Sequence, residues 1–330
     1  MITVGVGLAL VGGGCTKPSK GAGPSASPPS TTVAAPLTET EARSLLAELS
    51  RKNNQANAAL DSTLLNEYEA ESSFRIDNAV YRIGNVLDPQ HKDPIKPFDY
   101  GDGTFFIPRT GDPQWVAANV SVSGSKRRYL LVLSRQAAAQ PWKIVMQARI
   151  DADLPAVAND SGGNAVAAPP DDGTNLVAAP NEVAAAHATY LTGGATTPQA
   201  AMFAADQHSA EIVNDRQLRS ALVFVNNKTG VVAPAQTFTR TVTVEPYPVR
   251  VLRTADGAVL ACYVTKRQVV AAQPNGRTKL AGTDAALAGR TDFDQKVTIT
   301  WLDQWIVRIP ATNGGKVTVV AHQGGKESIS

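Results

Sequence analysis

The sequence predicts an α+β protein built from two tandem domains, each with N-terminal helices packed on an antiparallel sheet. Apolar residues follow helical spacing at the start of each half of the chain and alternate with a period of two later in each half. Between the halves lies a segment rich in Ala, Gly, Pro and Asp, residues 151–180. With 330 residues, of which 43% are hydrophobic, the chain is long enough for two cores. We therefore expect domains at 37–150 and 181–330, joined by a flexible linker.

The N-terminus has the pattern of an export signal. Residues 2–11 form an apolar run of signal-peptide length that is too short to cross a bilayer. The following Gly12-Gly-Gly-Cys15 resembles the bacterial lipobox, in which small residues precede a cysteine. The resemblance implies a signal peptide over residues 1–14 and diacylglycerol on Cys15. Gly12 stands where lipoboxes usually have Leu, and no positive charge precedes the apolar run, so we expect the true start upstream of Met1.

The segment after Cys15 is typical of a tether. Residues 16–36 are rich in Pro, Ser, Gly and Ala and show no apolar period. Two or three acyl chains on Cys15 would hold the protein durably on a membrane. We therefore expect a lipid-anchored protein on the extracytoplasmic face of the cell membrane. The alternatives are a plain secretory signal peptide or an apolar N-terminus on a cytosolic protein.

The first half begins with helix signals and continues with strand signals. Thr38-Glu-Thr-Glu41 is a capping box, and the helical period that follows extends to about Glu69. Alternation over Val116–Val122 and Ile144–Ile150 predicts half-buried antiparallel strands. Between them, Gly124–Arg128 reads as a hairpin tip that leads into a strand at Tyr129–Leu133.

The second half repeats this order. Helix signals cover residues 181–192 and recur after Thr197-Pro198, and alternation around Val242-Thr-Val244 and over 297–301 predicts strands. Gly314-Gly315 is expected to close a last hairpin into 316–321. The shared order suggests a tandem duplication.

Two resemblances follow from these features. Helices first and then a sheet with a Trp142-Lys-Ile-Val145 strand resemble the nuclear transport factor 2-like or cystatin-like fold, which implies a curved, cone-like sheet around the helices. The chain is also similar to an uncharacterised actinobacterial lipoprotein family; the features that match are Asn54-Gln-Ala-Asn57, Glu67-Tyr-Glu-Ala-Glu71, Phe105-Phe-Ile-Pro108, Trp115 and Pro141-Trp-Lys143. That family implies an anchor and a fold, and no assigned activity.

Charge and cysteine usage exclude several classes of protein. The 31 Lys and Arg against 29 Asp and Glu leave a net charge of +2, which offers no field for nucleic acid. The two cysteines, Cys15 and Cys262, exclude a disulfide framework. Cys262 lies within the apolar run 258–264, so we expect a buried, inert thiol.

No motif predicts a catalytic, cofactor or metal site. The sequence has no Gly-x-Ser-x-Gly elbow and no phosphate-binding loop. Asp206, His208 and Glu211 have helical spacing suited to a shared metal, but His208 falls on an apolar stripe, as does His187. Core histidines are therefore expected at both positions.

The acidic and aromatic candidates are likewise explained by solvation or burial rather than by a functional role. Glu67 and Glu69 are expected to be solvated at a helix end, although a cleft and shifted pKa values would make such a pair suited to acid–base catalysis. The tryptophans are expected in the core. Trp301 and Trp305, which we expect on adjacent strands, are the candidates for stacking on a ligand.

Two functional hypotheses from different classes remain. The first is a non-enzymatic envelope lipoprotein that presents a binding module to an envelope protein, a peptidoglycan-associated partner or a small molecule. The second is an enzyme whose cystatin-like pocket uses His187, His208 or Asp206. Convergence of these side chains in one deep pocket would favour the enzyme.

Overall fold

The computed structural model describes residues 36–110, 113–313 and 315–330. The predicted signal peptide, Cys15 and all of the predicted tether except Pro36 lie outside the described residues. Within the described part of the chain, no helix is both long enough and apolar enough to span a bilayer.

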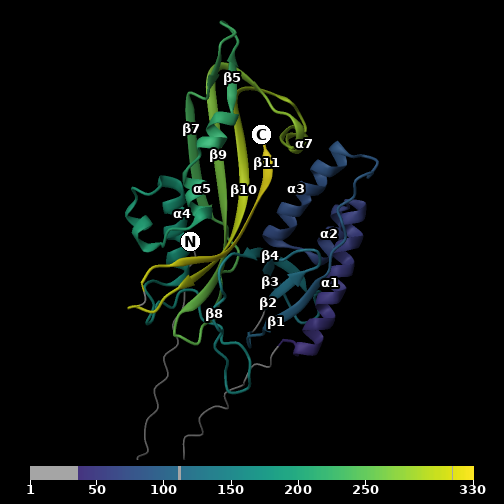
Figure 1. The fold of residues 1–330 in the computed structure, drawn as a ribbon, viewed down its shortest axis with the longest axis vertical. Helices are drawn as coiled ribbons and strands as arrows, with labels where there is room; N and C mark the ends of the chain where they lie inside the picture. Colours follow the sequence, from purple (N-terminus) through teal and green to yellow (C-terminus); the bar gives the residue numbers. More distant parts are fainter. Residues whose placement is uncertain (1–35, 111–112, 314) are drawn as a thin grey trace, which may run out of the picture. The chain divides into compact units, whose positions relative to one another are not determined.

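The chain order is helices, strands, helices and strands again (Figure 1). The helical segments are α1 (Glu39–Ala59), α2 (Ser62–Tyr68), α3 (Glu71–Leu87), α4 (Pro180–Gly193), the 3₁₀ helix η1 (Pro198–Met202), α5 (Gln207–Val213), α6 (Arg216–Ala221) and α7 (Gly282–Ala288). The strands are β1 (Tyr100–Phe106), β2 (Gln114–Val122), β3 (Arg128–Arg135), β4 (Lys143–Ile150), β5 (Val223–Asn226), β6 (Val232–Pro234), β7 (Thr237–Val244), β8 (Arg250–Arg253), β9 (Val259–Lys279), β10 (Asp292–Ile309) and β11 (Thr318–Ile329). These elements confirm the predicted α+β class.

All strands belong to one antiparallel sheet. Its order is β1-β2-β3-β4-β11-β10-β9-β5-β6, and β7 and β8 also pair with β9. The strands of the two halves meet where β4 pairs with β11, with Ala321 opposite Ile150 and His322 opposite Arg149. Both halves therefore end in the middle of the sheet.

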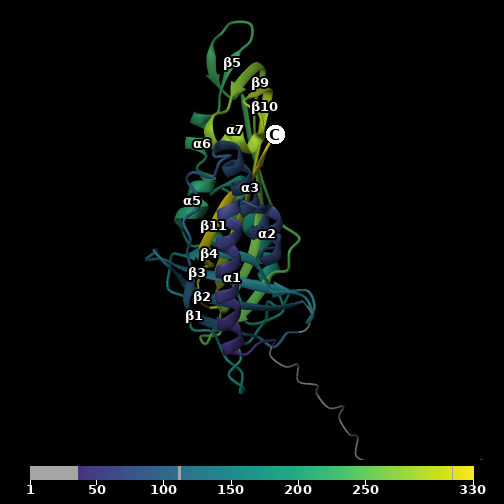
Figure 2. The same ribbon diagram turned by 90° about the vertical axis from the view of Figure 1, so that its right-hand side faces the viewer.

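The single sheet forms two layers, one with β1–β4 and one with β8–β11, which pack back to back between outer helices. Helices α1 to α3 cover one face of β1–β4, and α4 covers one face of β9 and β10; in Figure 1 these helix groups lie on opposite sides of the strands. The two remaining faces share a core in which Ala117, Leu130 and Val132 of the first half meet Cys262 and Ile306 of the second. Figure 2 looks onto α1 and α2 with β1–β4 behind them.

This shared core differs from the two-domain expectation, which is not confirmed. The described residues from Pro36 to Ser330 belong to one compact unit. The reason lies in strands β2 and β3, which bury consecutive residues such as Val116 and Ala117 and so are apolar on both faces. Each half can cover only one of its sheet faces with its own helices, and it buries the other face against its neighbour.

The segment predicted to be a flexible linker is instead held against β8. The Ala168 N–H donates to Val251 O (3.1 Å), and the Arg253 N–H donates to Val166 O (2.8 Å). Ala165 is buried in the shared core. The composition of this segment is typical of a linker and provides few apolar side chains, so its strand-like pairing with β8 was not recognisable in the sequence.

The predicted helix at Thr38 is confirmed, and helical structure reaches Tyr68 next to the expected end at Glu69, but as two helices rather than one. The Thr38–Glu41 capping box is present. Helix α1 ends at Ala59 because Leu60 adopts a left-handed conformation (φ 46°), and Asp61 then caps α2. Helix α3 was not predicted at all.

The predicted strands and hairpin of the first half are confirmed as β2, β3 and β4, with a turn at Gly124 (φ 76°). In the second half, helix α4 and the strands β7, β10 and β11 occupy the predicted positions. The β1-β2-β3-β4 order has a counterpart in the adjacent strands β8, β9, β10 and β11. Duplication stays a prediction that this strand order permits.

Candidate functional site

The histidine candidates do not converge on a pocket. His187 is fully buried: its Nδ1 lies 2.8 Å from the Tyr263 hydroxyl, and its Nε2 lies 3.0 Å from Ser209 Oγ. Burial lowers the pKa of His187 to about 3, so the ring is neutral. The prediction of a satisfied core histidine is confirmed there.

His208 and Asp206 are nearby but have other roles. The Asp206 carboxylate accepts from the Ser209 N–H (2.8 Å) and caps α5. His208 was expected to be a core residue, but its ring is partly exposed and pairs with Asp151 (2.8 Å). Glu211 accepts from Gln207 instead (2.7 Å). Among the described residues, no group of His, Cys, Asp and Glu has a geometry suited to a metal ion.

The tryptophan prediction is wrong in one respect. Trp301 and Trp305 lie on the same strand, β10, rather than on adjacent strands. Trp305 is fully buried, as expected of a core residue, whereas Trp301 is partly exposed beneath the Arg267 guanidinium, 4.3 Å from its ring centre. Cys262 is buried as predicted, and burial raises the pKa of its thiol to about 12.

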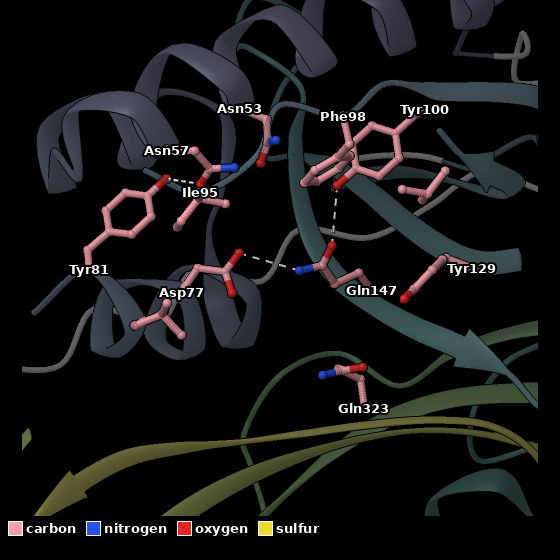
Figure 3. Close-up of a pocket in the computed structure, with 12 residues that line it drawn as sticks. Asn53, Asn57, Asp77, Tyr81, Ile95, Phe98, Tyr100, Tyr129, Gln147 and Gln323 are labelled. Atoms are coloured by element: carbon pink, nitrogen blue, oxygen red, sulfur yellow. Dashed lines mark hydrogen bonds between the residues drawn. The ribbon is translucent and has the colours of Figure 1, made fainter. Parts of the chain in front are cut away.

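A polar pocket lies in the first half instead, between helices α1 and α3 and the sheet (Figure 3). Its volume is about 380 Å³. The polar side chains that line it are Asn53, Asn57, Asp77, Gln147 and Gln323. The rings that line it are those of Tyr81, Phe98, Tyr100 and Tyr129. A few convergent polar groups among apolar and aromatic walls are typical of small-ligand sites.

Two amides of α1 are positioned by tyrosines. The Tyr81 hydroxyl donates to Asn57 Oδ1 (2.6 Å), and the Tyr68 hydroxyl donates to Asn53 Oδ1 (3.1 Å). Both asparagines are almost fully buried. Because a buried amide without partners costs free energy, these bonds hold the two side chains in single orientations.

Gln147 on β4 connects the pocket with the second half of the chain. Its side chain accepts from the Tyr100 hydroxyl (3.3 Å) and donates to Asp77 Oδ2 (3.4 Å), as Figure 3 shows. Its backbone N–H donates to Gln304 Oε1 on β10 (3.1 Å), and Gln304 in turn donates to Ser72 Oγ (2.8 Å). The pocket is therefore built on hydrogen bonds from both halves.

A buried acid pair is associated with this pocket. Glu69 was expected to be solvated, but its exposed fraction is 0% because the chain between α2 and α3 is hydrogen-bonded to β4 (Ala70 N–H to Ile144 O, 2.9 Å). Neither carboxyl oxygen of Glu69 meets a donor among the described residues. Burial and the neighbouring carboxyl of Asp77 raise the pKa of Glu69 well above its usual range.

Asp77 is the member of the pair that lines the pocket. Burial raises the pKa of Asp77 to about 6, against the opposing effect of hydrogen bonds with Glu69 and Gln147. Two neighbouring carboxyls, of which Glu69 is fully buried and Asp77 partly buried, cannot both ionise at low cost, so at neutral pH Glu69 keeps a proton and Asp77 is the carboxylate. The arrangement can bind a donor or a cation and can exchange a proton with it.

The sequence contains only a partial signal for this site. Leu49, Asn53 and Asn57 are four residues apart, so the amides lie on the apolar stripe of α1. Likewise Asp77 and Tyr81 are one turn apart on α3. Polar residues on a buried stripe indicate a site, but their convergence required the positions of β1, β4 and β11.

Comparisons with known proteins identify relatives but no solved structure, since none matches this chain. An uncharacterized lipoprotein of Streptomyces avermitilis is 26% identical over 296 residues, which covers 87% of this chain and 84% of the relative. An uncharacterized lipoprotein of Streptomyces coelicolor is 30% identical over 168 residues, or 49% of this chain and 47% of the relative. The nuclear transport factor 2-like and cystatin-like resemblance stays a prediction.

These relatives confirm the predicted similarity to uncharacterised actinobacterial lipoproteins. Their names indicate a lipid-anchored, membrane-associated protein. The family described as a domain of unknown function, DUF8094, matches residues 33–326, which include every residue of the polar pocket. The chain therefore belongs to the DUF8094 family.

Proposed function

We propose that this protein is a binding lipoprotein of the cell envelope, anchored on the extracytoplasmic face through diacylglycerol on Cys15, which takes up a small ligand in the polar pocket. The observation that carries the proposal is the convergence of amide, carboxyl and aromatic side chains around a space of about 380 Å³. Tyr81 and Gln147 hold these groups in place before a ligand enters. Preorganisation of this kind reduces the entropy cost of binding.

Blocking the pocket should abolish ligand binding. Val80 on α3 is 45% exposed and lines the pocket, so Val80→Trp should fill its entrance with little cost to the core. Val86 is on the same helix, is 59% exposed and is not a lining residue, which makes Val86→Trp the matched control. Saturation-transfer NMR with a library of small cationic, neutral and anionic solutes should reveal ligands that bind the wild type and Val86→Trp but not Val80→Trp. If no solute separates the two variants, the pocket is not a binding site.

The anchor is tested separately in an actinobacterial host. Cys15→Ala should leave the membrane fraction and appear in the medium, because the thioether bond needs the thiol of that residue. Cys262→Ala, which removes the other cysteine, should stay in the membrane fraction. Retention of Cys15→Ala at the membrane would exclude this attachment.

An enzyme acting in the same pocket is the second candidate. It is favoured by the Asp77 carboxyl, whose pKa of about 6 is suited to proton transfer near neutral pH. The residues that the sequence suggested for an enzyme, His187, His208 and Asp206, do not line this pocket. Recovery of the bound ligand unchanged after prolonged incubation would support binding, and its conversion would support the enzyme.

A further inference from the structure

The charges around the polar pocket are unbalanced. Among the residues that line it, the only ionisable group that is charged near neutral pH is the Asp77 carboxylate, since no Lys, Arg or His is present. The two arginines of α3 nearest to Asp77 point elsewhere: Arg75 pairs with carboxylates of the second half, and Arg82 donates to a carbonyl of α7. No cation of the described chain lines the pocket to neutralise Asp77.

Three donors of the pocket are bonded within it. The hydroxyls of Tyr81 and Tyr100 donate to Asn57 and Gln147, and the Gln147 amide donates weakly to Asp77 at 3.4 Å. The charged group of the pocket is thus an acceptor, the Asp77 carboxylate, with one weak donor from the residues that line the pocket. A ligand that brings N–H donors or positive charge complements it, whereas an anion would be repelled.

Aromatic rings supply a second kind of attraction. Phe98, Tyr100 and Tyr129 line the same space as Asp77, and Phe98 and Tyr100 meet edge to face with ring centres 5.4 Å apart. Figure 3 shows these rings on the side of the pocket opposite the α3 carboxylate. The faces of aromatic rings attract cations, and methylated ammonium groups in particular.

The acid pair sets the charge that the pocket accepts. Glu69 is fully buried beside Asp77 and has no other hydrogen-bonding partner among the described residues, so it retains its proton. The pair therefore carries one negative charge, on the carboxyl that faces the pocket. One positive charge on a ligand is sufficient to balance it.

On the basis of the proposed function, we infer that the ligand of the polar pocket is an organic ammonium ion whose cationic group lies between the Asp77 carboxylate and the rings of Phe98, Tyr100 and Tyr129. The volume of about 380 Å³ limits the ligand to a small molecule. The amides of Asn53, Asn57 and Gln323 are then placed to bind polar groups on the rest of the ligand.

The test compares cations with neutral molecules of the same shape. Isothermal titration of the purified full-length protein should show that choline binds at least about tenfold more tightly than 3,3-dimethylbutan-1-ol, its uncharged isostere. Phenethylamine should likewise bind more tightly than 2-phenylethanol. Asp77→Asn should weaken binding of both cations by about 10- to 100-fold, the usual range for loss of a charge-assisted contact. Asp99→Asn, which removes the same charge from an exposed residue beside Tyr100, should leave affinity unchanged.

Because choline keeps its charge at every pH, the pH dependence reports on the protein alone. The titratable groups around Asp77 are Glu69, Tyr68, Tyr81, Tyr100 and Tyr129. Burial raises the pKa of Tyr68, Tyr81 and Tyr100, so these hydroxyls stay neutral. With Asp77 titrating near pH 6, choline affinity should rise about tenfold from pH 5 to pH 7.5 in the wild type and stay flat in Asp77→Asn.

The two proposals fail in different ways. If the neutral isosteres bind as tightly as the cations, if the cations do not bind, or if Asp77→Asn binds them normally, the ammonium inference is overturned. Binding of other solutes that is lost in Val80→Trp would still support the pocket as a ligand site. A choline signal that persists in Val80→Trp would place the cation elsewhere and would also overturn the inference.

Discussion

Replacing Arg75 by alanine should lower the free energy of unfolding by about 2–4 kcal/mol. Arg75 of α3 donates to Glu245, which follows β7, and to Glu327 on β11, and so joins the first half to the second. Glu245 is only 6% exposed. Without the guanidinium, the Glu245 carboxylate would keep only Lys266 as an ion-pair partner, 3.3 Å away and 41% exposed. Loss of one partner from a buried ion pair costs far more than loss of a surface pair.

The measurement is urea unfolding monitored by tryptophan fluorescence, with Arg82→Ala as the control. Arg82 is on the same helix but is exposed, and it donates one hydrogen bond to the Leu287 carbonyl (2.9 Å). Its loss should cost less than about 1 kcal/mol. Equal effects of the two variants would mean that the Arg75 contacts do not hold α3 on the second half. A single transition in the wild type would also support one cooperative unit formed by the described residues.

Trp305→Ala should destabilise the protein by about 3–5 kcal/mol, the usual cost of removing a buried aromatic side chain. Trp305 is fully buried in the core beneath α4, where its ring centre lies 4.5 Å from that of His187 and 4.2 Å from that of His322. Its indole N–H donates to Thr265 Oγ1 (2.9 Å). Alanine would leave a cavity and an unsatisfied hydroxyl acceptor, and the packed rings around it cannot close the space.

The matched control is Trp301→Ala, four residues earlier on the same strand. Trp301 is partly exposed at the edge of a second core and contacts the Arg267 guanidinium, so its loss should cost less, about 1–2 kcal/mol. Thermal and urea unfolding of both variants give the comparison. If Trp301→Ala were the more destabilising change, the assignment of Trp305 to the centre of this core would be wrong.

Much of the fold was predictable because its signals are local. The capping box at Thr38 satisfies backbone donors within one turn, and the alternation over Val116–Val122 follows from the geometry of a strand. Helix α3 was not predicted although its apolar residues follow helical spacing, and its burial depends on two surfaces, the sheet on one side and α7 on another. The two-domain expectation is not confirmed for a related reason, since the shared core has residues from both halves.

In the candidate site, too, local sequence patterns did not reveal the environment of the residues. Asp206 and His208 had a recognisable spacing, yet the structure uses one as a helix cap and pairs the other with Asp151, far away in sequence. Glu69 had no recognisable sequence signal, because nothing in the sequence distinguishes a buried carboxylate at a helix end from a solvated one. Its environment is set by backbone pairing with β4, about 75 residues further along the chain.

The sequence by itself determined the α+β class, the main helix start, the positions of β2, β3 and β4 and the lipoprotein pattern around Cys15. Each of these depends on residues within a few positions of one another, where backbone geometry allows a limited set of outcomes. Only the tertiary structure decided that the halves share a core and that Asp77 lines a pocket with Glu69 buried beside it. Burial and pKa depend on which distant segments pack together, and that information is distributed over the whole chain rather than contained in any one motif.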